Sequence, residues 1–345
     1  MSFKVKVLPS NHEFVVEPGN TVLDAALDAG IVLPYSCRSG TCSTCKGKII
    51  EGQWDAGHAP EQILEKEDLD QGYTLLCQAH PKSDLVVEAS VVRMSTDIEV
   101  RKMPGRVMEL QDLAPDVKLI RLQLPTSQFF RYLPGQYLIF ILRDGSKRSY
   151  SMANVASEEN LIDLHVRHMP GGVFTDHVFG AGDTSMKVRE IQRVEGPYGS
   201  SFLREDSNKP IVFVVSGTGF APIKAMMERL IETGSRRSVV LYWGGRRPHD
   251  IYMRELAEQW EQEHPSFKFI PVISEARPED NWVGRTGFVH HAVMEDLPDL
   301  SEYQVYACGT PVMVNSAQKD FIEKNNLPEE EFFADAFTSE ADAVT

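Results

Sequence analysis

The sequence predicts a multidomain protein with a small α+β domain, an antiparallel β-barrel and an α/β domain with a mainly parallel sheet. Its 345 residues exceed one ordinary domain and suit two or three domains of roughly 100 to 150 residues. Short strands dominate the first two thirds, whereas strands and amphipathic helices alternate in the last third. We expect domains at residues 1–92, 103–204 and 205–345, with a charged linker at 93–102.

The charge balance excludes several classes of partner. Lys and Arg number 35 against 50 Asp and Glu, and the net charge of −15 would be repelled by phosphate backbones and anionic lipid. The longest apolar runs, at 137–142 and 211–215, are far shorter than the roughly 20 residues of a membrane-spanning helix. The amino terminus lacks the pattern of a secretory signal. We therefore expect a cytoplasmic monomer that binds neither nucleic acid nor membrane.

The first domain begins with alternating apolar residues at 3–7 and 13–17, which predict a hairpin. Thr21 and Asp24 resemble a capping box, the apolar residues at 22–27 recur at helical spacing, and Gly30 is a plausible stop. Further strands are expected at 48–50 and 85–92, on either side of an acidic stretch at 61–70.

Four of the five cysteines form the most specific motif. Cys37, Cys42 and Cys45 have the spacing C-x4-C-x2-C, and Cys77 follows later, which is the pattern of four thiolates around a 2Fe-2S cluster. The residues between them are small or polar, so backbone amides can approach the cluster sulfides. The alternatives are a structural zinc site, which usually uses paired short spacings, or unrelated thiols.

This loop, the preceding Pro34-Tyr35 and the sequence Leu76-Cys77-Gln78 make residues 1–92 resemble a plant-type ferredoxin domain. The resemblance implies a β-grasp fold.

The middle domain shows strand patterns at 120–124, 136–142, 161–166 and 187–194, which predict the barrel. Within it, Arg148 can neutralise a diphosphate, Tyr150 can lie on an isoalloxazine ring, and the Ser151 hydroxyl can reach the ring's reactive nitrogen edge. Taken alone, an Arg-Ser-Tyr-Ser string is more often a polar edge of a barrel.

A second motif follows, with glycines and a hydroxyl suited to cradling phosphate at a helix start: Gly171, Gly172, Val173 and Thr175. Its alternative is a hairpin turn. Together the two motifs resemble the flavin-binding domain of the ferredoxin-NADP reductase superfamily, with its R-x-Y-S and G-G-x-x-S/T motifs. The resemblance implies FAD rather than FMN, and His165 and Arg167 join the candidate cofactor-binding residues.

The last domain alternates strands at 211–215, 238–243, 267–274, 304–307 and 332–337 with helices at 221–232, 251–263, 287–296 and 311–324. This order predicts βαβ units with ligands at the carboxyl ends of the strands. After the first strand, Gly217, Thr218 and Gly219 let a backbone approach a pyrophosphate, and Pro222 suits the first helical position. The third glycine of the dinucleotide motif is missing.

Cys308, Gly309 and Pro311 end a strand and open a helix, where a nicotinamide would lie. They match the superfamily's C-G-x-P motif, which implies that Cys308 lines the hydride-transfer site; the alternative is a small buried cysteine. Phe337 resembles the terminal aromatic residue that shields the flavin, or else it is a core residue of an edge strand.

Cofactor preference rests on Arg246 and Arg247, which could meet a 2′-phosphate, and on Asp250, which could accept a hydrogen bond from a ribose hydroxyl. NADH is our choice, because reductases with a leading ferredoxin domain mostly use it. The adjacent His290 and His291 are interpreted as a surface or half-buried pair.

The three motif sets together resemble the single-chain reductase components of bacterial oxygenases and the CDP-deoxyglucoseen reductase group. The resemblance implies a catalytic site at Ser151, Cys308 and Phe337, hydride transfer from NADH to FAD, and single electrons passed through the cluster to an oxygenase or another terminal acceptor protein. The alternatives are a reductase for a deoxysugar dehydrase, a redox sensor without turnover, and a subunit of a membrane-linked quinone reductase.

Overall fold

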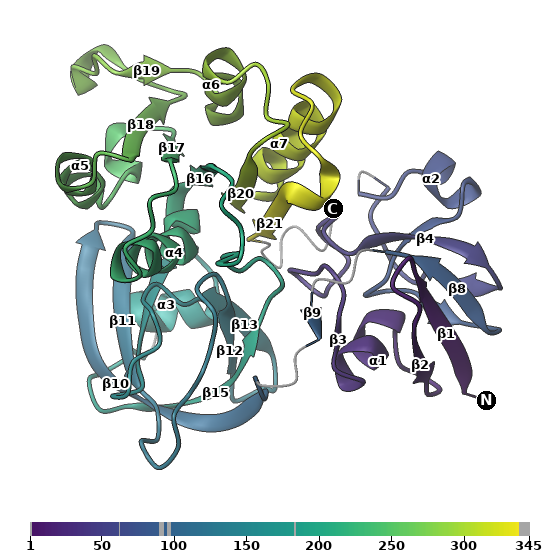
Figure 1. Cartoon of the computed structure of the whole chain (residues 1–345). Helices are drawn as coiled ribbons and strands as arrows, with labels where there is room; N and C mark the ends of the chain where they lie inside the picture. The colour runs from purple at the N-terminus through teal and green to yellow at the C-terminus, as the bar shows by residue number, and fades with distance from the viewer. Residues whose placement is uncertain (1, 62, 90–92, 95–97, 183, 338–345) are drawn as a thin grey trace. The chain divides into compact units, whose positions relative to one another are not determined.

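The computed structural model describes residues 2–61, 63–89, 93–94, 98–182 and 184–337. It divides into two units, one of residues 1–97 with 334–345 and one of residues 98–333 (Figure 1). Within the described ranges, no helix combines the length and the apolar character needed to cross a membrane.

The first unit contains a mixed five-stranded sheet in the order β2-β1-β8-β4-β6. Strand β1 pairs antiparallel with β2 and parallel with β8, as the predicted hairpin requires. Thr21 caps the helix α1, because its Oγ1 accepts a hydrogen bond from the backbone amide of Asp24 at 3.1 Å. The β-grasp fold is therefore confirmed. The elements are β1 (Phe3–Leu8), β2 (His12–Val16), α1 (Val22–Asp28), β3 (Ile31–Val32), β4 (Lys46–Glu51), β5 (Trp54–Asp55), α2 (Lys66–Asp70), β6 (Tyr73–Leu75), β7 (His80–Pro81), β8 (Leu85–Glu88) and β9 (Arg93–Met94).

The middle of the chain forms an antiparallel sheet in the order β13-β12-β15-β10-β11-β14. An antiparallel bridge between Met152 and Leu164 connects its two edges, so the sheet closes as the predicted barrel. The elements are β10 (Arg101–Ala114), β11 (Val117–Gln123), β12 (Tyr137–Ile141), β13 (Lys147–Ser151), β14 (Leu161–Arg167), α3 (Val173–Phe179) and β15 (Ile191–Tyr198).

Three of the predicted strand and linker boundaries between residues 85 and 198 differ from those in the structure. The expected strand at 187–194 begins only at Ile191 and continues to Tyr198. The expected linker at 93–102 has strand residues at both ends, because β9 pairs with β3 and β10 begins at Arg101. The expected strand at 85–92 ends at Glu88, and residues 90–92 lie outside the described ranges.

The last part of the chain builds a sheet in the order β19-β18-β17-β16-β20-β21, in which the first five strands pair parallel. This confirms the α/β prediction. The predicted helices at 251–263 and 287–296 begin later, at Arg254 and Val289. The elements are β16 (Ile211–Ser216), α4 (Phe220–Glu232), β17 (Val239–Gly245), α5 (Arg254–Glu263), β18 (Phe267–Ile273), β19 (Arg285–Thr286), α6 (Val289–Asp296), β20 (Gln304–Gly309), α7 (Pro311–Lys324) and β21 (Phe332–Ala336), with short 3-10 turns at Gly217–Gly219, Pro248–Asp250, Pro278–Asp280 and Glu329–Glu331.

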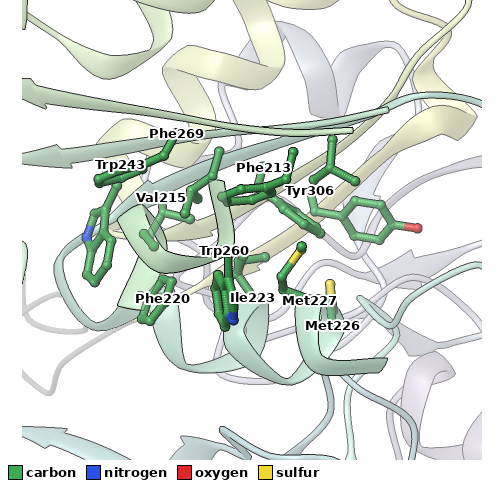
Figure 2. Packing of buried hydrophobic residues seen from close by; sticks show 14 of the residues in the cluster. Phe213, Val215, Phe220, Ile223, Met226, Met227, Trp243, Trp260, Phe269 and Tyr306 are labelled. Carbon is green, nitrogen blue, oxygen red and sulfur yellow. The ribbon is translucent and has the colours of Figure 1, made fainter. Parts of the chain in front are cut away.

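The core of this α/β region lies between the sheet and helix α4. Figure 2 shows Phe213 and Val215 from β16 facing Ile223 and Met226 from α4. Apolar residues on α4 recur at three- and four-residue spacing, so one face of the helix is buried against the strands. The first residue of α4, Phe220, stacks on Trp243 with ring centroids 3.9 Å apart. This packing fixes the start of the helix next to the glycine-containing turn.

Candidate functional site

The cysteine loop brings four sulfur atoms together as two pairs. Cys42, Cys45 and Cys77 are buried and Cys37 is partly exposed. A hydrogen bond with Cys42 lowers the pKa of the Cys37 thiol to about 4, and the same contact raises the pKa of Cys42. A hydrogen bond with Cys45 likewise lowers the pKa of Cys77 and raises that of Cys45.

The spacing of these sulfur atoms separates the two metal interpretations. In the described part of the chain, no three of the four sulfur atoms all lie within 4.8 Å of one another. The thiolates around a single tetrahedral zinc ion would lie about 3.8 Å apart, since each Zn–S bond is about 2.3 Å. Two pairs of sulfur atoms fit two iron ions that each hold two thiolates, as in a 2Fe-2S cluster.

The backbone around the cysteines also suits a cluster. The amide of Ser39 donates to the Cys37 sulfur at 3.4 Å, as expected of donors that stabilise charge on cluster ligands. Gly40 has a φ of +81°, and a Cβ there would lie 2.8 Å from the carbonyl oxygen of His58. Arg38 at the start of the loop pairs with Asp24 of α1 at 2.7 Å, a contact that no sequence motif indicates. The helix therefore anchors the loop.

The R-S-Y-S motif forms strand β13 on the barrel. Arg148 and Tyr150 are two residues apart, so their side chains share a face of the strand. The Tyr150 ring contacts Phe174 of α3 at 5.2 Å between centroids, and burial raises the pKa of its hydroxyl. Ser151 ends the strand and is buried. Arg148 and Tyr150 can thus contact one planar, phosphorylated ligand, while a hydrogen bond from Ser151 stays a prediction.

The glycine pair begins helix α3, but its polar groups already have partners. Gly171 has a φ of +87°, and its amide donates to the Asp176 carboxylate at 3.1 Å. The Thr175 hydroxyl donates to the carbonyl of Met169 at 2.8 Å, so it shapes the loop. Gly172 is the N-cap of α3, and Val173 is strongly exposed. Phosphate contacts from this turn therefore stay a prediction, and Asp176 is a residue that the motif analysis missed.

The side chains of His165 and Arg167, on β14, contact residues of the α/β region. His165 is buried, and its Nδ1 lies 2.8 Å from the hydroxyl of Tyr252. Arg167 donates to the Asp250 carboxylate at 3.3 Å, and a Cβ on Gly217 would lie 3.0 Å from Arg167 Nη1. These two side chains therefore join the barrel to the segment after β17, and Arg167 also lies beside Gly217, contacts that sequence spacing alone does not reveal.

Burial lowers the pKa of His165 to about 3, mainly by desolvation of the charged ring. The unfolded chain, with a histidine pKa near 6.5, takes up a proton between about pH 6.5 and 3 that the folded chain does not. We therefore expect stability to be lost as the pH falls below about 6.5, by at most about 1.4 kcal/mol per pH unit from this residue.

Denaturant unfolding of His165→Gln measured from pH 7.5 to 5 checks this expectation. The variant should be less stable at pH 7.5 and should show a shallower pH dependence than the parent. His58→Gln, at an exposed position, is the control and should keep the parental slope. Parallel pH profiles for His165→Gln and the parent would show that His165 is not buried as a neutral ring.

The carboxyl ends of β16 and β20 are joined at the turn expected to bind pyrophosphate. Ser216 Oγ accepts a hydrogen bond from the amide of Thr310 at 3.0 Å, and a Cβ on Gly219 would overlap the carbonyl oxygen of Cys308. Strands β17 and β20 flank β16 on opposite sides, so this is the topological switch point where α/β sheets bind ligands. This topology is compatible with the expected nucleotide site, and pyrophosphate binding by the turn stays a prediction.

Pro222 is the third residue of α4, not the first as predicted. The 3-10 turn Gly217–Gly219 leads directly into Phe220, so the helix begins earlier. Proline is tolerated there because amides of the first turn have no intrahelical acceptor.

The three residues predicted to contact the ribose and its 2′-phosphate, Asp250, Arg246 and Arg247, differ in exposure and in hydrogen-bond partners. The Asp250 carboxylate accepts hydrogen bonds from the amides of Arg246 and Arg247 at 2.9 and 3.0 Å and is 3% exposed. It caps this turn, so the expected contact with a ribose hydroxyl is disfavoured. Arg247 is paired with Asp280 at 2.5 Å, whereas the Arg246 side chain is 67% exposed. Arg246 is therefore the more accessible cation of the two.

The roles predicted for Cys308 and Phe337, at the hydride-transfer site and beside the flavin, stay predictions. Cys308 is fully buried in the core of the α/β region, as expected for the structural alternative. Phe337 follows β21 and is partly exposed. Gly309, between Cys308 and Thr310, has a φ of +140°, a conformation that favours glycine.

The comparisons with known proteins match this geometry along almost the whole chain. Residues 5–82 match the 2Fe-2S iron-sulfur cluster binding domain, residues 104–202 the oxidoreductase FAD-binding domain, and residues 213–319 the oxidoreductase NAD-binding domain. The CDP-6-deoxy-L-threo-D-glycero-4-hexulose-3-dehydrase reductase of Yersinia pestis is 40% identical over 337 residues, which cover 98% of this chain and 99% of that protein. The chain belongs to the single-chain 2Fe-2S ferredoxin reductases.

Other relatives of this reductase are named for different enzymes. The phenol hydroxylase P5 protein of Acinetobacter pittii is 34% identical, with 100% of this chain and 97% of that protein covered. The crystal structure of an Amycolatopsis cytochrome P450 reductase has a TM-score of 0.76 and 33% identity, covering 98% and 99% of the two chains. The reductase is thus an NAD(P)H-dependent oxidoreductase that uses NADH, FAD and a 2Fe-2S cluster to pass electrons to a partner.

The residues of this chain prepare the site for that chemistry. When bound, FAD can accept a hydride and release electrons one at a time. It is needed because nicotinamide transfers two electrons and the iron-sulfur cluster takes only one. By the sequence prediction, Arg148 of β13 would hold the diphosphate through its positive charge, and Tyr150 would present a ring face to the isoalloxazine. Lys224 of α4 donates to the carbonyl of Ala153, which follows β13, at 3.1 Å. This contact holds the start of the nucleotide-binding helix beside the flavin motif.

Arg148→Ala tests the flavin assignment. We expect FAD to bind about 10- to 100-fold more weakly, because the variant loses a charge-assisted phosphate contact of about 1.5 to 3 kcal/mol. The flavin-to-protein ratio after gel filtration, read from the visible absorbance, should fall. Arg143→Ala, an exposed arginine on the turn before β13, should retain flavin. A full flavin complement in Arg148→Ala would reject the phosphate contact.

Proposed function

We propose that this reductase oxidises NADH and delivers single electrons to a separate catalytic protein, working as a cytoplasmic monomer. The observation that supports the order of transfer is the placement of three motifs in one chain. The thiolate loop lies in the first unit. In the second unit, Lys224 of α4 donates to the carbonyl of Ala153 just after the R-S-Y-S strand, and Arg167 of the barrel donates to Asp250 after β17. NADH and flavin sites within one unit suit direct hydride transfer, which needs the reacting atoms within about 3 to 3.5 Å.

The proposed partner is an oxygenase or a deoxysugar dehydrase. Relatives named as reductases of terephthalate 1,2-dioxygenase, from Comamonas, and of an aromatic O-demethylase, from Amycolatopsis, are each 35% identical over nearly the full chain. These names support an oxygenase. The dehydrase reductase of Yersinia pestis, at 40% identity, supports the second class, which we would therefore test first.

The experiment measures NADH oxidation in the presence of each partner class. The purified reductase is mixed with a CDP-6-deoxyhexulose dehydrase or with an aromatic oxygenase, each with its own substrate, and product formation is followed beside NADH loss. If the reductase delivers electrons to one of these partners, product should form in that mixture in proportion to the NADH consumed. Rapid ferricyanide reduction without coupling to either would reject both partner classes, and no turnover with any acceptor would favour a redox sensor.

Two further parts of the proposal have direct measurements. Light scattering of the flavin-loaded reductase should give the mass of one chain of 38.8 kDa. Steady-state kinetics should show a higher kcat/KM with NADH than with NADPH, because the Asp280 carboxylate neutralises Arg247, one of the two cations that could meet a 2′-phosphate. Preference for NADPH would show that these arginines do meet a 2′-phosphate.

A further inference from the structure

We propose that His290, His291 and Asp320 form a second metal site, which binds a divalent first-row transition-metal ion such as Zn²⁺. One ligand atom from each of the three side chains lies within 4.8 Å of the other two. Both histidines belong to the first turn of α6, and Asp320 belongs to α7, which packs beside α6 (Figure 1). Nothing in the proposed electron path uses these residues.

The set of donor atoms suits zinc and its neighbours. Two imidazoles and one carboxylate are common ligands for Zn²⁺, with bonds of about 2.0 to 2.2 Å and a water molecule as the fourth ligand. Nε2 of His290 already lies 3.5 Å from Oδ2 of Asp320, which is close to the separation of two ligands on one tetrahedral ion. Small side-chain rotations would therefore complete the site.

Two of the three proposed ligands are largely shielded from bulk water. His290 is 8% exposed, and the Asp320 side chain is also largely buried. The ring of Phe288 lies against His290 and His291, at 6.1 and 5.8 Å between centroids.

Lys324 is the group that competes with a metal. Its ammonium lies 2.6 Å from Oδ1 of Asp320, one helical turn away on α7, and its side chain is largely exposed. The ammonium group neutralises the Asp320 carboxylate, so it weakens that carboxylate as a ligand for a divalent cation. Because the lysine is exposed, it can move into solvent when a metal binds. The geometry thus predicts that removing Lys324 strengthens metal binding, which a merely structural cluster would not show.

A bound ion would join the start of α6 to the middle of α7. The consequence is a nucleotide-binding region that is more stable with metal than without, since a ligand that binds only the folded state stabilises it.

The test uses the full chain with its flavin and cluster loaded, so that the four cluster cysteines are already occupied. Binding of Zn²⁺ is measured by titration calorimetry, and binding of Co²⁺ by its visible absorption. We expect saturable binding of one ion and a rise in the unfolding temperature. Asp320→Asn and His291→Ala should each weaken binding by at least about tenfold, since even outer-shell changes cost about 10- to 100-fold.

Two other variants make the result specific. Lys324→Ala should bind Zn²⁺ more tightly than the parent, and His264→Ala, at the end of α5, should bind it equally well. The iron content and the electron paramagnetic resonance signal of the cluster should not change. Absence of saturable binding, or equal binding by the parent, Asp320→Asn and His291→Ala, would overturn the proposal.

Discussion

Cys42→Ser is expected to abolish the reduction of cytochrome c by NADH while the reduction of ferricyanide continues. Cys42 is 1% exposed and lies in hydrogen-bond contact with Cys37, so a serine there places a poor iron ligand inside the cluster site. The cluster carries electrons out of the reductase, whereas ferricyanide can accept them from the flavin. The rate of cytochrome c reduction should therefore fall at least about 100-fold, or about 2.7 kcal/mol in the effective barrier.

Iron analysis and electron paramagnetic resonance after dithionite reduction accompany the rate measurements. Val15→Ala, an exposed position on β2 of the same domain, is the matched control and should retain iron, signal and both activities. Equal loss of both activities in Cys42→Ser would contradict a linear order of transfer. A persistent cluster signal with normal iron content would show that Cys42 is not a ligand.

The elements that sequence reasoning found are those in which local pattern and burial agree. The strand Ile211–Ser216 is buried along nearly its whole length, and it reads as a short continuous apolar run. Helix α1 has both a cap at Thr21 and a buried apolar face. In contrast, the less exposed positions in the first half of β10 include Arg101 and Gly105. The sequence therefore shows no alternation of apolar and polar side chains there, and this 14-residue strand was missed.

The candidate site was predictable where one short segment supplies several donors. The cysteine spacing and the R-S-Y-S strand each act locally, so their chemistry follows from the order of residues. Contacts between distant segments were not predictable. Asp250 is paired with Arg167 of the barrel, and His165 with Tyr252, and neither pair leaves a trace in local sequence. His290 and His291 gain their third potential ligand from Asp320, which lies on another helix.

Gly219→Ala is expected to disrupt the nucleotide site while leaving the flavin and the cluster in place. Gly219 has a φ of −55°, which alanine adopts without strain, so the effect of this substitution is steric. The added Cβ would overlap the backbone carbonyl oxygen of Cys308, and neither atom can rotate away because the backbone fixes the position of both. Either the turn after β16 or the end of β20 must move.

The displacement would separate two segments that Ser216 and Thr310 now hold together at 3.0 Å. A misplacement of about 1 Å near a reacting centre can reduce a rate by about 100-fold, so kcat/KM for NADH should fall by about that factor. Overpacking should also lower stability by about 1 to 3 kcal/mol. Steady-state kinetics with ferricyanide and denaturant unfolding measure the two effects, and visible absorbance reports whether flavin and cluster remain bound.

Gly105→Ala in β10 provides the control. A Cβ there would lie 3.4 Å from its nearest neighbours, the methyl groups of Leu122 and Leu124, which is an ordinary contact. This variant should therefore keep the parental kinetics. If Gly219→Ala had the parental kcat/KM for NADH, the turn would accommodate a Cβ in spite of the short distance to Cys308. The close packing of β16 and β20 would then not be what positions the nicotinamide.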